Sequence, residues 1–246
     1  MPYIIFLYAL LLGSFYNVVG LRVPLKQSIV KPRSSCPGCK NTLGTRELVP
    51  VFSYLFLKGK CRHCNQRISP LYPIMELSNG LLFVFAYIKL GWSVELIIAW
   101  LLISLFVIIF VSDVTYMLIP DKVLLVFTGI FLAARVIYPL TPWWDSLAGA
   151  TVGFSLLLLI AIVSKGGMGG GDIKLFAVLG LVLGTKLILL SFFAATLLGA
   201  VTGVIGLAVG VFKKSNPIPF GPYIGLGTLI VYFYHHEIMN WYFSFF

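Results

Sequence analysis

The feature that most constrains this chain is a series of apolar runs, several of which approach the roughly 20 residues that a helix needs to cross a bilayer. Of its 246 residues, 59% are hydrophobic and only 11% are charged, and the mean hydropathy is +1.00. A soluble domain carries about 25% charged residues. We therefore expect an all-α, polytopic membrane protein.

The apolar runs predict about eight transmembrane helices. The first run has no basic residue before it and no small-residue cleavage pattern after it, so we interpret it as a retained helix rather than a removable signal peptide. The boundary between the sixth and seventh runs, in GLVLGTKLILL, is the hardest to place. The expected spans are 3–20, 71–90, 95–112, 122–138, 146–163, 173–184, 186–212 and 221–238.

The distribution of Lys and Arg predicts the orientation of these helices. Ten of the 18 lie in one long polar segment, 21–70, five more fall in loops on the same side, and three fall on the other side. Cytoplasmic loops carry the excess of Lys and Arg. We therefore expect 21–70 in the cytoplasm and the N-terminus outside, and we attribute the net charge of +10 to topology rather than to nucleic-acid binding. The five are Lys122, Lys165, Lys174, Lys213 and Lys214, and the three are Lys89, Arg135 and Lys186.

All four cysteines lie in the segment 21–70, as CPGC and CRHC with 21 residues between the pairs. They are Cys36, Cys39, Cys61 and Cys64. Two such turns can supply four thiolates to one tetrahedral zinc ion. A segment of about 50 residues cannot depend on a hydrophobic core alone, and cytoplasmic thiols stay reduced. We predict a structural Zn²⁺ site, with redox-active CxxC motifs as the alternative and His63 as a bystander.

Among the eight acidic residues, Asp113 and Asp172 are the strongest candidates for chemistry. Both are expected at cytoplasmic ends of helices, as are Glu76 and Asp121. Asp172 alone can be a helix cap, whereas Asp113 continues an apolar run, where an ionisable group is costly and usually functional. Two carboxylates that meet cannot both ionise easily, so such a pair can share a proton and activate water, as in aspartic proteases. The remaining four are interpreted as solvated or interfacial: Glu47, Glu95, Asp145 and Glu237.

The stretch before Asp172, KGGMGGGDIKL, contains five glycines. Irregular backbone near membrane depth is tolerated only where protein or water satisfies its polar groups. Glycines also allow an extended substrate backbone to approach closely. We therefore predict that Gly169, Gly170 and Gly171, together with Lys174, form a substrate-facing loop.

An ordered set of motifs resembles a known family over nearly the whole chain. GGGD followed by IKL matches the GxGD motif of membrane aspartic proteases, and it resembles that of bacterial type IV prepilin peptidases in particular. The chain departs from the pattern by a glycine in the variable position of the motif, and it is compact for the family. The other matching motifs are GSFYNVVGLRVP, the CPGC and CRHC pair, LVPVFSYLFLKGKC, RISPLYPIMEL and SDVTYMLIPD.

The resemblance implies a bifunctional enzyme of the bacterial inner membrane. It would remove the leader of prepilins or pseudopilins after a glycine, on the cytoplasmic side, and methylate the new N-terminal amine with S-adenosylmethionine. The family's catalytic aspartates fall on Asp113 and Asp172, and its zinc motif on the four cysteines. Asp121 matches a position that also admits asparagine, which favours a structural role. Glu76 and Lys60 are the candidates for methyl transfer.

We expect a first helix over 1–20, a tetracysteine module over 21–70 linked to methyl transfer, and a peptidase bundle over 71–246. The alternative is a non-enzymatic membrane assembly factor, whose zinc ribbon binds a partner and whose aspartates only cap helices. A third reading, an ion-coupled transporter, predicts inverted repeats and acidic residues near the bilayer midplane. The sequence shows no evident repeat, and its acidic residues fall at the inner edge.

Overall fold

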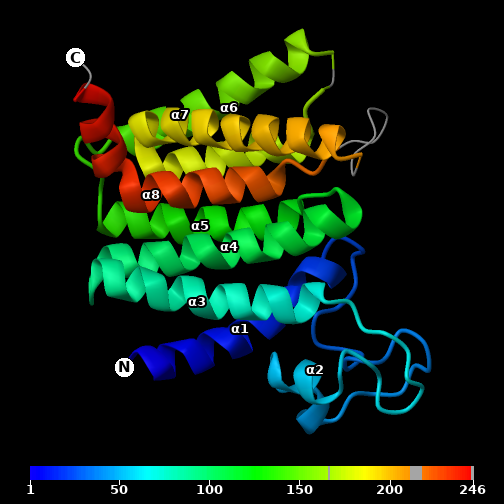
Figure 1. The fold of residues 1–246 in the computed structure, drawn as a ribbon. Helices are drawn as coiled ribbons and strands as arrows, with labels where there is room; N and C mark the ends of the chain where they lie inside the picture. The colour runs from blue at the N-terminus through cyan, green and yellow to red at the C-terminus, as the bar shows by residue number, and fades with distance from the viewer. Residues whose placement is uncertain (166, 211–217, 245–246) are drawn as a thin grey trace. The chain divides into compact units, whose positions relative to one another are not determined.

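The computed structural model describes residues 1–165, 167–210 and 218–244. Over these residues the protein is helical and forms no β-strand, only two isolated β-bridges (Figure 1). Two short helices, η1 (Thr45–Glu47) and α2 (Phe52–Phe56), lie between the first two long ones. The long helices are α1 (Pro2–Arg22), α3 (Leu71–Leu90), α4 (Val94–Tyr116), α5 (Asp121–Ile137), α6 (Asp145–Val163), α7 (Gly170–Ala208) and α8 (Gly221–Phe243).

Five of these helices, α1, α3, α4, α6 and α7, are long and apolar enough to cross a membrane. They confirm the all-α, multi-pass membrane protein, but the expected count of eight spans is wrong for the described residues. Helix α5 has 17 residues, at the lower limit of about 17–25 for a transmembrane helix, and the expected spans 173–184 and 186–212 form one element, α7. Gly166, Lys213, Lys214 and the last residues of the span 186–212 lie outside the described residues.

The chain divides into two compact units, Met1–Thr115 and Tyr116–Phe246. In the first unit, α1 and α3 run antiparallel (Figure 1). Two buried amides join these helices: Asn79 Nδ2 donates to the Ala9 carbonyl at 2.6 Å, and Asn17 Nδ2 donates to the Tyr72 carbonyl at 3.1 Å. Interhelical hydrogen bonds of this kind hold apolar helices together where the hydrophobic effect supplies little. They fix the register of α1 against α3.

Helix α4 packs against both of these helices within the first unit. The hydroxyls of Tyr16 and Ser104 are hydrogen-bonded at 2.8 Å, which joins α1 to α4. Trp100 Nε1 donates to the Phe83 carbonyl at 3.0 Å, and the two rings stack with centroids 5.4 Å apart, which joins α3 to α4. The cytoplasmic ends that we predicted for α1 and α3 are connected by the tetracysteine segment.

In the second unit, α7 is a hairpin rather than one straight rod. Gly184 has a non-helical backbone with φ 76° and ψ 177°. Phe176 and Phe192 would be about 24 Å apart along a continuous helix, yet their ring centroids lie 6.1 Å apart. The segments before and after Gly184 therefore lie side by side, as the yellow and orange parts of α7 do in Figure 1. From the sequence we expected the break between the two spans at residue 185, one residue after Gly184.

Two charged side chains hold the turn at Gly184. Buried Arg135, at the end of α5, donates from Nε and Nη2 to the Val182 carbonyl at 3.0 and 2.6 Å. Asp145, at the start of α6, accepts the Thr185 N–H at 3.1 Å. Asp145 was predicted to be solvated or interfacial; its carboxylate is half-buried and binds backbone in the turn.

Helices α6 and α7 approach closely where Gly149 faces Gly180. A Cβ on Gly180 would overlap the Gly149 carbonyl and stand 2.8 Å from the Ala150 nitrogen.

Gly180→Ala should therefore destabilise the protein by about 1–3 kcal/mol, because backbone must move to admit the methyl group. The measurement is the apparent melting temperature of the purified protein in detergent. Gly129→Ala in α5 is the matched control, since its Cβ would meet no described atom within 4 Å. Equal melting temperatures for the two variants would contradict the close approach.

Candidate functional site

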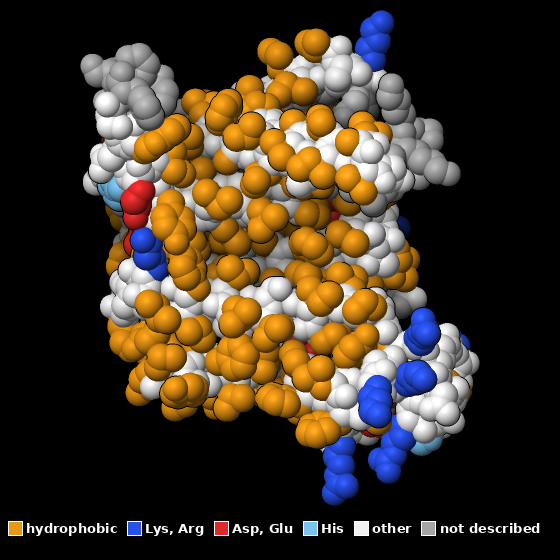
Figure 2. All heavy atoms as spheres, in the orientation of Figure 1, with side chains coloured by type: hydrophobic (Ala, Val, Ile, Leu, Met, Phe, Trp, Pro, Cys, Tyr) orange, Lys and Arg blue, Asp and Glu red, His pale blue; other side chains and the backbone are white. Residues whose placement is uncertain are grey.

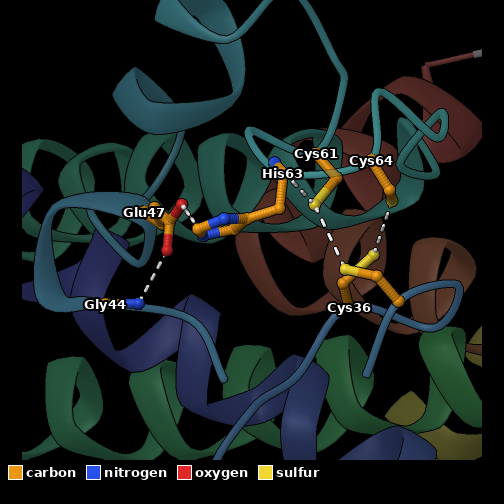
Figure 3. Close-up of polar contacts among 7 residues, drawn as sticks. Cys36, Gly44, Glu47, Cys61, His63 and Cys64 are labelled. Carbon is orange, nitrogen blue, oxygen red and sulfur yellow. Dashed lines mark hydrogen bonds and ion pairs between the residues drawn. The ribbon is translucent and has the colours of Figure 1, made fainter. Parts of the chain in front are cut away.

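The four cysteines converge into one cluster in the segment between α1 and α3 (Figure 3). Their Sγ atoms all lie within 4.8 Å of one another, with Cys36 and Cys64 at 3.7 Å and Cys39 and Cys61 at 3.9 Å. In a tetrahedral site with Zn–S bonds of about 2.3 Å, two sulfurs are about 3.8 Å apart. The predicted cluster is confirmed, and its donor set fits a four-coordinate thiophilic metal.

The two cysteine pairs sit in backbone turns that repeat each other. In each turn the first cysteine N–H donates to the carbonyl five residues later, and its own carbonyl accepts the N–H four residues later. The residue after each second cysteine, Lys40 or Asn65, has a left-handed backbone, with φ of 58° and 57°. The matching bonds are Cys36 N to Asn41 O, Cys61 N to Gln66 O, Lys40 N to Cys36 O and Asn65 N to Cys61 O.

Backbone dipoles around the cluster favour a metal-binding thiolate. The N–H groups of Cys39 and Gly38 donate to the Cys36 sulfur and lower the pKa of this thiol to about 6, whereas burial and the neighbouring thiols raise the pKa of Cys39 to about 11. His63 lies outside the four-sulfur group: its Nε2 faces Glu47 Oε1 at 3.7 Å, while Glu47 Oε2 accepts the Gly44 N–H at 2.7 Å (Figure 3). The imidazole therefore contacts a carboxylate next to the cluster rather than the sulfurs.

Asp113 lies in the last turn of α4, in the first unit, and is 6% exposed. The helix that carries it is the most apolar of the five candidate spans, with a mean hydropathy of 2.9. A carboxyl group buried at the end of such a helix is costly to keep. This burial distinguishes Asp113 from a solvated residue at a helix end.

Asp172 is the third residue of α7, in the second unit, and is half-buried. The N-cap of this helix is Gly169, so Asp172 is not the N-cap residue that the capping alternative expected. In the first turn a carboxylate still gains from the helix dipole. Asp113 and Asp172 belong to different units, and their meeting in one site stays a prediction.

The three glycines before Asp172 differ in what surrounds them. A Cβ on Gly171 would stand 2.8 Å from the Ile119 Cβ, whereas one on Gly170 would meet no described atom within 4 Å. A Cβ on Gly169 would lie 3.0 Å from Asp172 Oδ2. A Cβ atom would therefore meet open space at Gly170, whereas at Gly171 it would meet Ile119 in the loop before α5.

Lys174 and Asp121 form an ion pair, with Nζ at 2.9 and 2.8 Å from the two carboxylate oxygens. Their side chains are 54% and 67% exposed, so the pair contributes only about 0–1 kcal/mol. Asp121 thus links the start of α5 to the first turn of α7. A structural role for Asp121 accords with this contact.

Glu76 is buried near the start of α3, at 7% exposure, and borders a cavity of about 490 Å³ in the first unit. Its Oε2 accepts the Val51 N–H at 2.8 Å, and Ser14 adds a hydrogen bond from α1. Sequence reasoning found Glu76 but missed the other polar residues of this cavity, which come from distant segments without a common motif. They include Asn17, Arg67 and Tyr54.

Lys60 lies elsewhere, on a second cavity of about 660 Å³. Its backbone forms the bridge with Arg67 that closes the second cysteine turn. Tyr54 and Arg67 border both cavities, whereas Glu76 borders only the first and Lys60 only the second. The structure therefore does not bring the two methyl-transfer candidates into one cavity.

Two family models match the chain. The model described as "Bacterial Peptidase A24 N-terminal domain" matches residues 7–90, and that of the "Type IV leader peptidase family" matches residues 100–204. The first match includes the tetracysteine segment and Glu76, and the second includes Asp113 and the glycine loop with Asp172.

Curated relatives match over nearly their whole length. A "Prepilin leader peptidase/N-methyltransferase" of Bacillus subtilis (strain 168) is 47% identical over 239 residues, which is 97% of this chain and 96% of the relative. A protein of the same description from Aeromonas salmonicida (strain A449) is 32% identical over 275 residues, covering 98% of this chain and 93% of the relative. No solved structure matches the chain.

Proposed function

Since the chain belongs to the type IV leader peptidase family, we propose that it is a membrane aspartic endopeptidase that removes the leader of type IV prepilins or pseudopilins. Cleavage follows a glycine, immediately before the hydrophobic N-terminal helix of the substrate. The enzyme then N-methylates the new N-terminal residue, as the description of its relatives states for them. Family membership weighs against the assembly-factor and transporter readings.

The peptidase step is assigned to Asp113 and Asp172. One carboxylate takes a proton from a water molecule as the water oxygen attacks the carbonyl carbon of the scissile bond. The other, protonated, donates its proton to the leaving nitrogen, and the C–N bond breaks. The burial of Asp113 supports its role, because aspartate is rarely buried without a partner or a function. Asp172 lies in the first turn of α7, where the helix dipole favours a carboxylate.

The glycine loop is assigned to substrate binding. Gly169, Gly170 and Gly171 precede the catalytic Asp172, and the open space beside Gly170 suits an extended backbone next to the carboxylate. Lys174 extends from the same turn on the exposed side. Its ammonium group forms an exposed ion pair with Asp121.

The tetracysteine segment is assigned to methyl transfer. A bound Zn²⁺ ion would be held by Cys36, Cys39, Cys61 and Cys64 and would serve only to stabilise this segment, since four sulfurs leave no open coordination position. S-adenosylmethionine supplies the methyl group. Of the two predicted candidates, which border different cavities, Glu76 is the residue proposed to assist.

The enzyme is proposed to lie in the bacterial cytoplasmic membrane with 21–70 and both aspartates on the cytoplasmic side and the N-terminus outside. Figure 2 shows Lys and Arg side chains gathered over the tetracysteine segment, while hydrophobic side chains cover the visible surface of the long helices. A basic loop next to apolar helices is what the positive-inside rule predicts for a cytoplasmic loop.

The observation that carries this function is the 47% identity over 97% of the chain. The test incubates the purified chain in detergent with a candidate prepilin and labelled S-adenosylmethionine and reads the product by mass. We expect a product shortened by the leader and heavier by one methyl group. Intact prepilin after incubation with several prepilin-like substrates would contradict the proposal.

A further inference from the structure

We propose that the cavity bordered by α1, α3 and the tetracysteine segment is the binding site for S-adenosylmethionine, with Glu76 as the anion that faces its cationic groups. The inference rests on the proposed N-methyltransferase function and adds where the methyl donor binds. No family match assigns this cavity a ligand.

The cavity has the size and composition of a small-molecule site. Its volume of about 490 Å³ lies within the roughly 300–1,000 Å³ of such sites. Apolar side chains from α1 and from the loop form part of its wall, and polar groups converge on it from five stretches of the first unit. The polar lining residues are Ser14, Asn17, Arg22, Ser34, Ser35, Glu47, Ser53, Tyr54, Arg67, Ser69, Tyr72 and Glu76.

Glu76 gives the cavity a buried carboxyl group in a fixed position. Its carboxylate is 7% exposed and is held by the Val51 N–H and by Ser14. An ionised carboxylate has about four acceptor positions, so these two bonds leave capacity for a ligand. A buried anion strongly favours a cationic partner. The methyl donor carries two cationic groups, a sulfonium and an ammonium, which suit the carboxylates of Glu76 and Glu47 on this cavity.

Asn17 points independently to a hydrogen-bond donor in the same cavity. The residue is 2% exposed, and its Nδ2 is used by the Tyr72 carbonyl. Its Oδ1 is buried and has no hydrogen-bond partner among the described residues. Buried acceptors are nearly always satisfied in folded proteins. The hydroxyl and amino groups of an adenosyl ligand can donate the hydrogen bond that Asn17 Oδ1 lacks.

The remaining lining residues complement the other parts of the ligand. Arg22 is committed to the loop, since its Nη1 donates to the carbonyls of Ser28 and Pro32. Arg67 is therefore the guanidinium assigned to the donor's carboxylate, in the paired geometry that Arg favours. The ring of Tyr54 is half-buried on the same wall and offers a face for the adenine or the sulfonium.

The reaction at this site is a single displacement. The neutral N-terminal amine of the cleaved substrate attacks the methyl carbon with its lone pair as the C–S bond breaks. The bonding electrons stay on sulfur, which becomes the neutral thioether of S-adenosylhomocysteine, and the methylated ammonium loses one proton to a base. The sulfonium charge is lost in this step, so an anion such as Glu76 distinguishes the donor from the spent product by charge.

The first test locates the ligand without relying on turnover. The full chain in nanodiscs is irradiated with methyl-tritiated S-adenosylmethionine, and the labelled peptides are mapped. We expect label in peptides that contain Ser14–Arg22, Ser34–Leu57 or Arg67–Glu76. Label confined to peptides of Tyr116–Phe246, or to Lys58–Lys60, would overturn the assignment.

The second test measures binding by calorimetry. Glu76→Gln should weaken S-adenosylmethionine at least tenfold but S-adenosylhomocysteine less than threefold, because only the first carries the sulfonium. Ser53→Phe, which fills the cavity and leaves the carboxylate, should weaken both equally. Glu95→Gln, an acidic residue of the same unit away from this cavity, is the matched control and should bind as the wild type does. Wild-type affinities in Glu76→Gln and in Ser53→Phe would overturn the proposal.

Product masses from the same preparations separate this inference from the proposed function. If the wild type cleaves and methylates while label maps elsewhere, only the cavity assignment fails. If the wild type cleaves but neither methylates nor binds the donor, the methyltransferase function fails with it. An unchanged apparent melting temperature in detergent confirms that Glu76→Gln is folded.

Discussion

Asp113→Ala and Asp172→Ala should each lower the rate of leader cleavage by about 10³-fold or more, since each removes one member of a general acid–base pair. The readout is the shortened prepilin in a purified assay. The isosteric variants Asp113→Asn and Asp172→Asn should lose cleavage to the same degree, because they keep the volume but not the titrating group. The double variant should be no slower than either single one, since residues that act as a unit are not additive.

Asp121→Ala is the matched control, since this exposed carboxylate lies on the same expected side and binds only weakly to Lys174. It should keep most of the cleavage rate. A substrate supplied without its leader should still be methylated by Asp113→Asn and Asp172→Asn, because methyl transfer needs a free amine and not the aspartates. Full cleavage by either alanine variant, or additive losses in the double variant, would contradict the aspartate pair.

Removing the metal should have the second largest effect. Structural zinc sites contribute apparent binding free energies of about 10–16 kcal/mol at pH 7, and that energy is folding energy. Replacing Cys36 and Cys61 by serine should therefore reduce zinc from one ion per chain to none and expose the segment 21–70 to protease. Methyl transfer should fall more than tenfold, because Cys36 borders the cavity assigned to the donor. Leader cleavage should persist, because both aspartates lie outside the segment.

His63→Ala is the control for the metal site, since His63 faces Glu47 rather than the sulfurs. This variant should keep its zinc in elemental analysis. A purified wild-type protein that contains no zinc, with all four thiols reacting freely with a thiol reagent, would contradict the metal site.

Much of this fold could be predicted because a bilayer restricts what a chain can do. Apolar runs of about 20 residues have to be helices, since every backbone group must be satisfied within the segment. The cluster of four cysteines could be predicted for a similar reason, because a CxxC turn is a local structure. Two such turns together supply four sulfur ligands. These patterns identified the helices and the sulfur cluster without knowledge of tertiary contacts.

Contacts between distant residues could not be read in this way. In the sequence, Arg135 was only one of the basic residues counted to predict membrane orientation. In the structure, its guanidinium donates hydrogen bonds to the Val182 carbonyl. The unpaired Oδ1 of Asn17 depends on how α1 sits against α3, which no local pattern encodes. Lys60 and Glu76 were grouped because both lie near family motifs, whereas the fold separates them into two cavities. Chemistry that arises from tertiary packing has no period or spacing in the sequence.

The hairpin of α7 has a consequence for depth in the membrane. The 14 residues from Gly170 to Leu183 span about 21 Å, roughly 9 Å less than the hydrocarbon core of a bilayer. With Asp172 at the predicted cytoplasmic edge of the membrane, we expect the buried turn at Gly184 to lie at the depth of the hydrocarbon core rather than in water. Arg135 and Asp145 bind the backbone of that turn from within the protein. We infer that these contacts satisfy backbone groups that water would satisfy in a loop outside the bilayer, so that a segment shorter than the hydrocarbon core can end inside it.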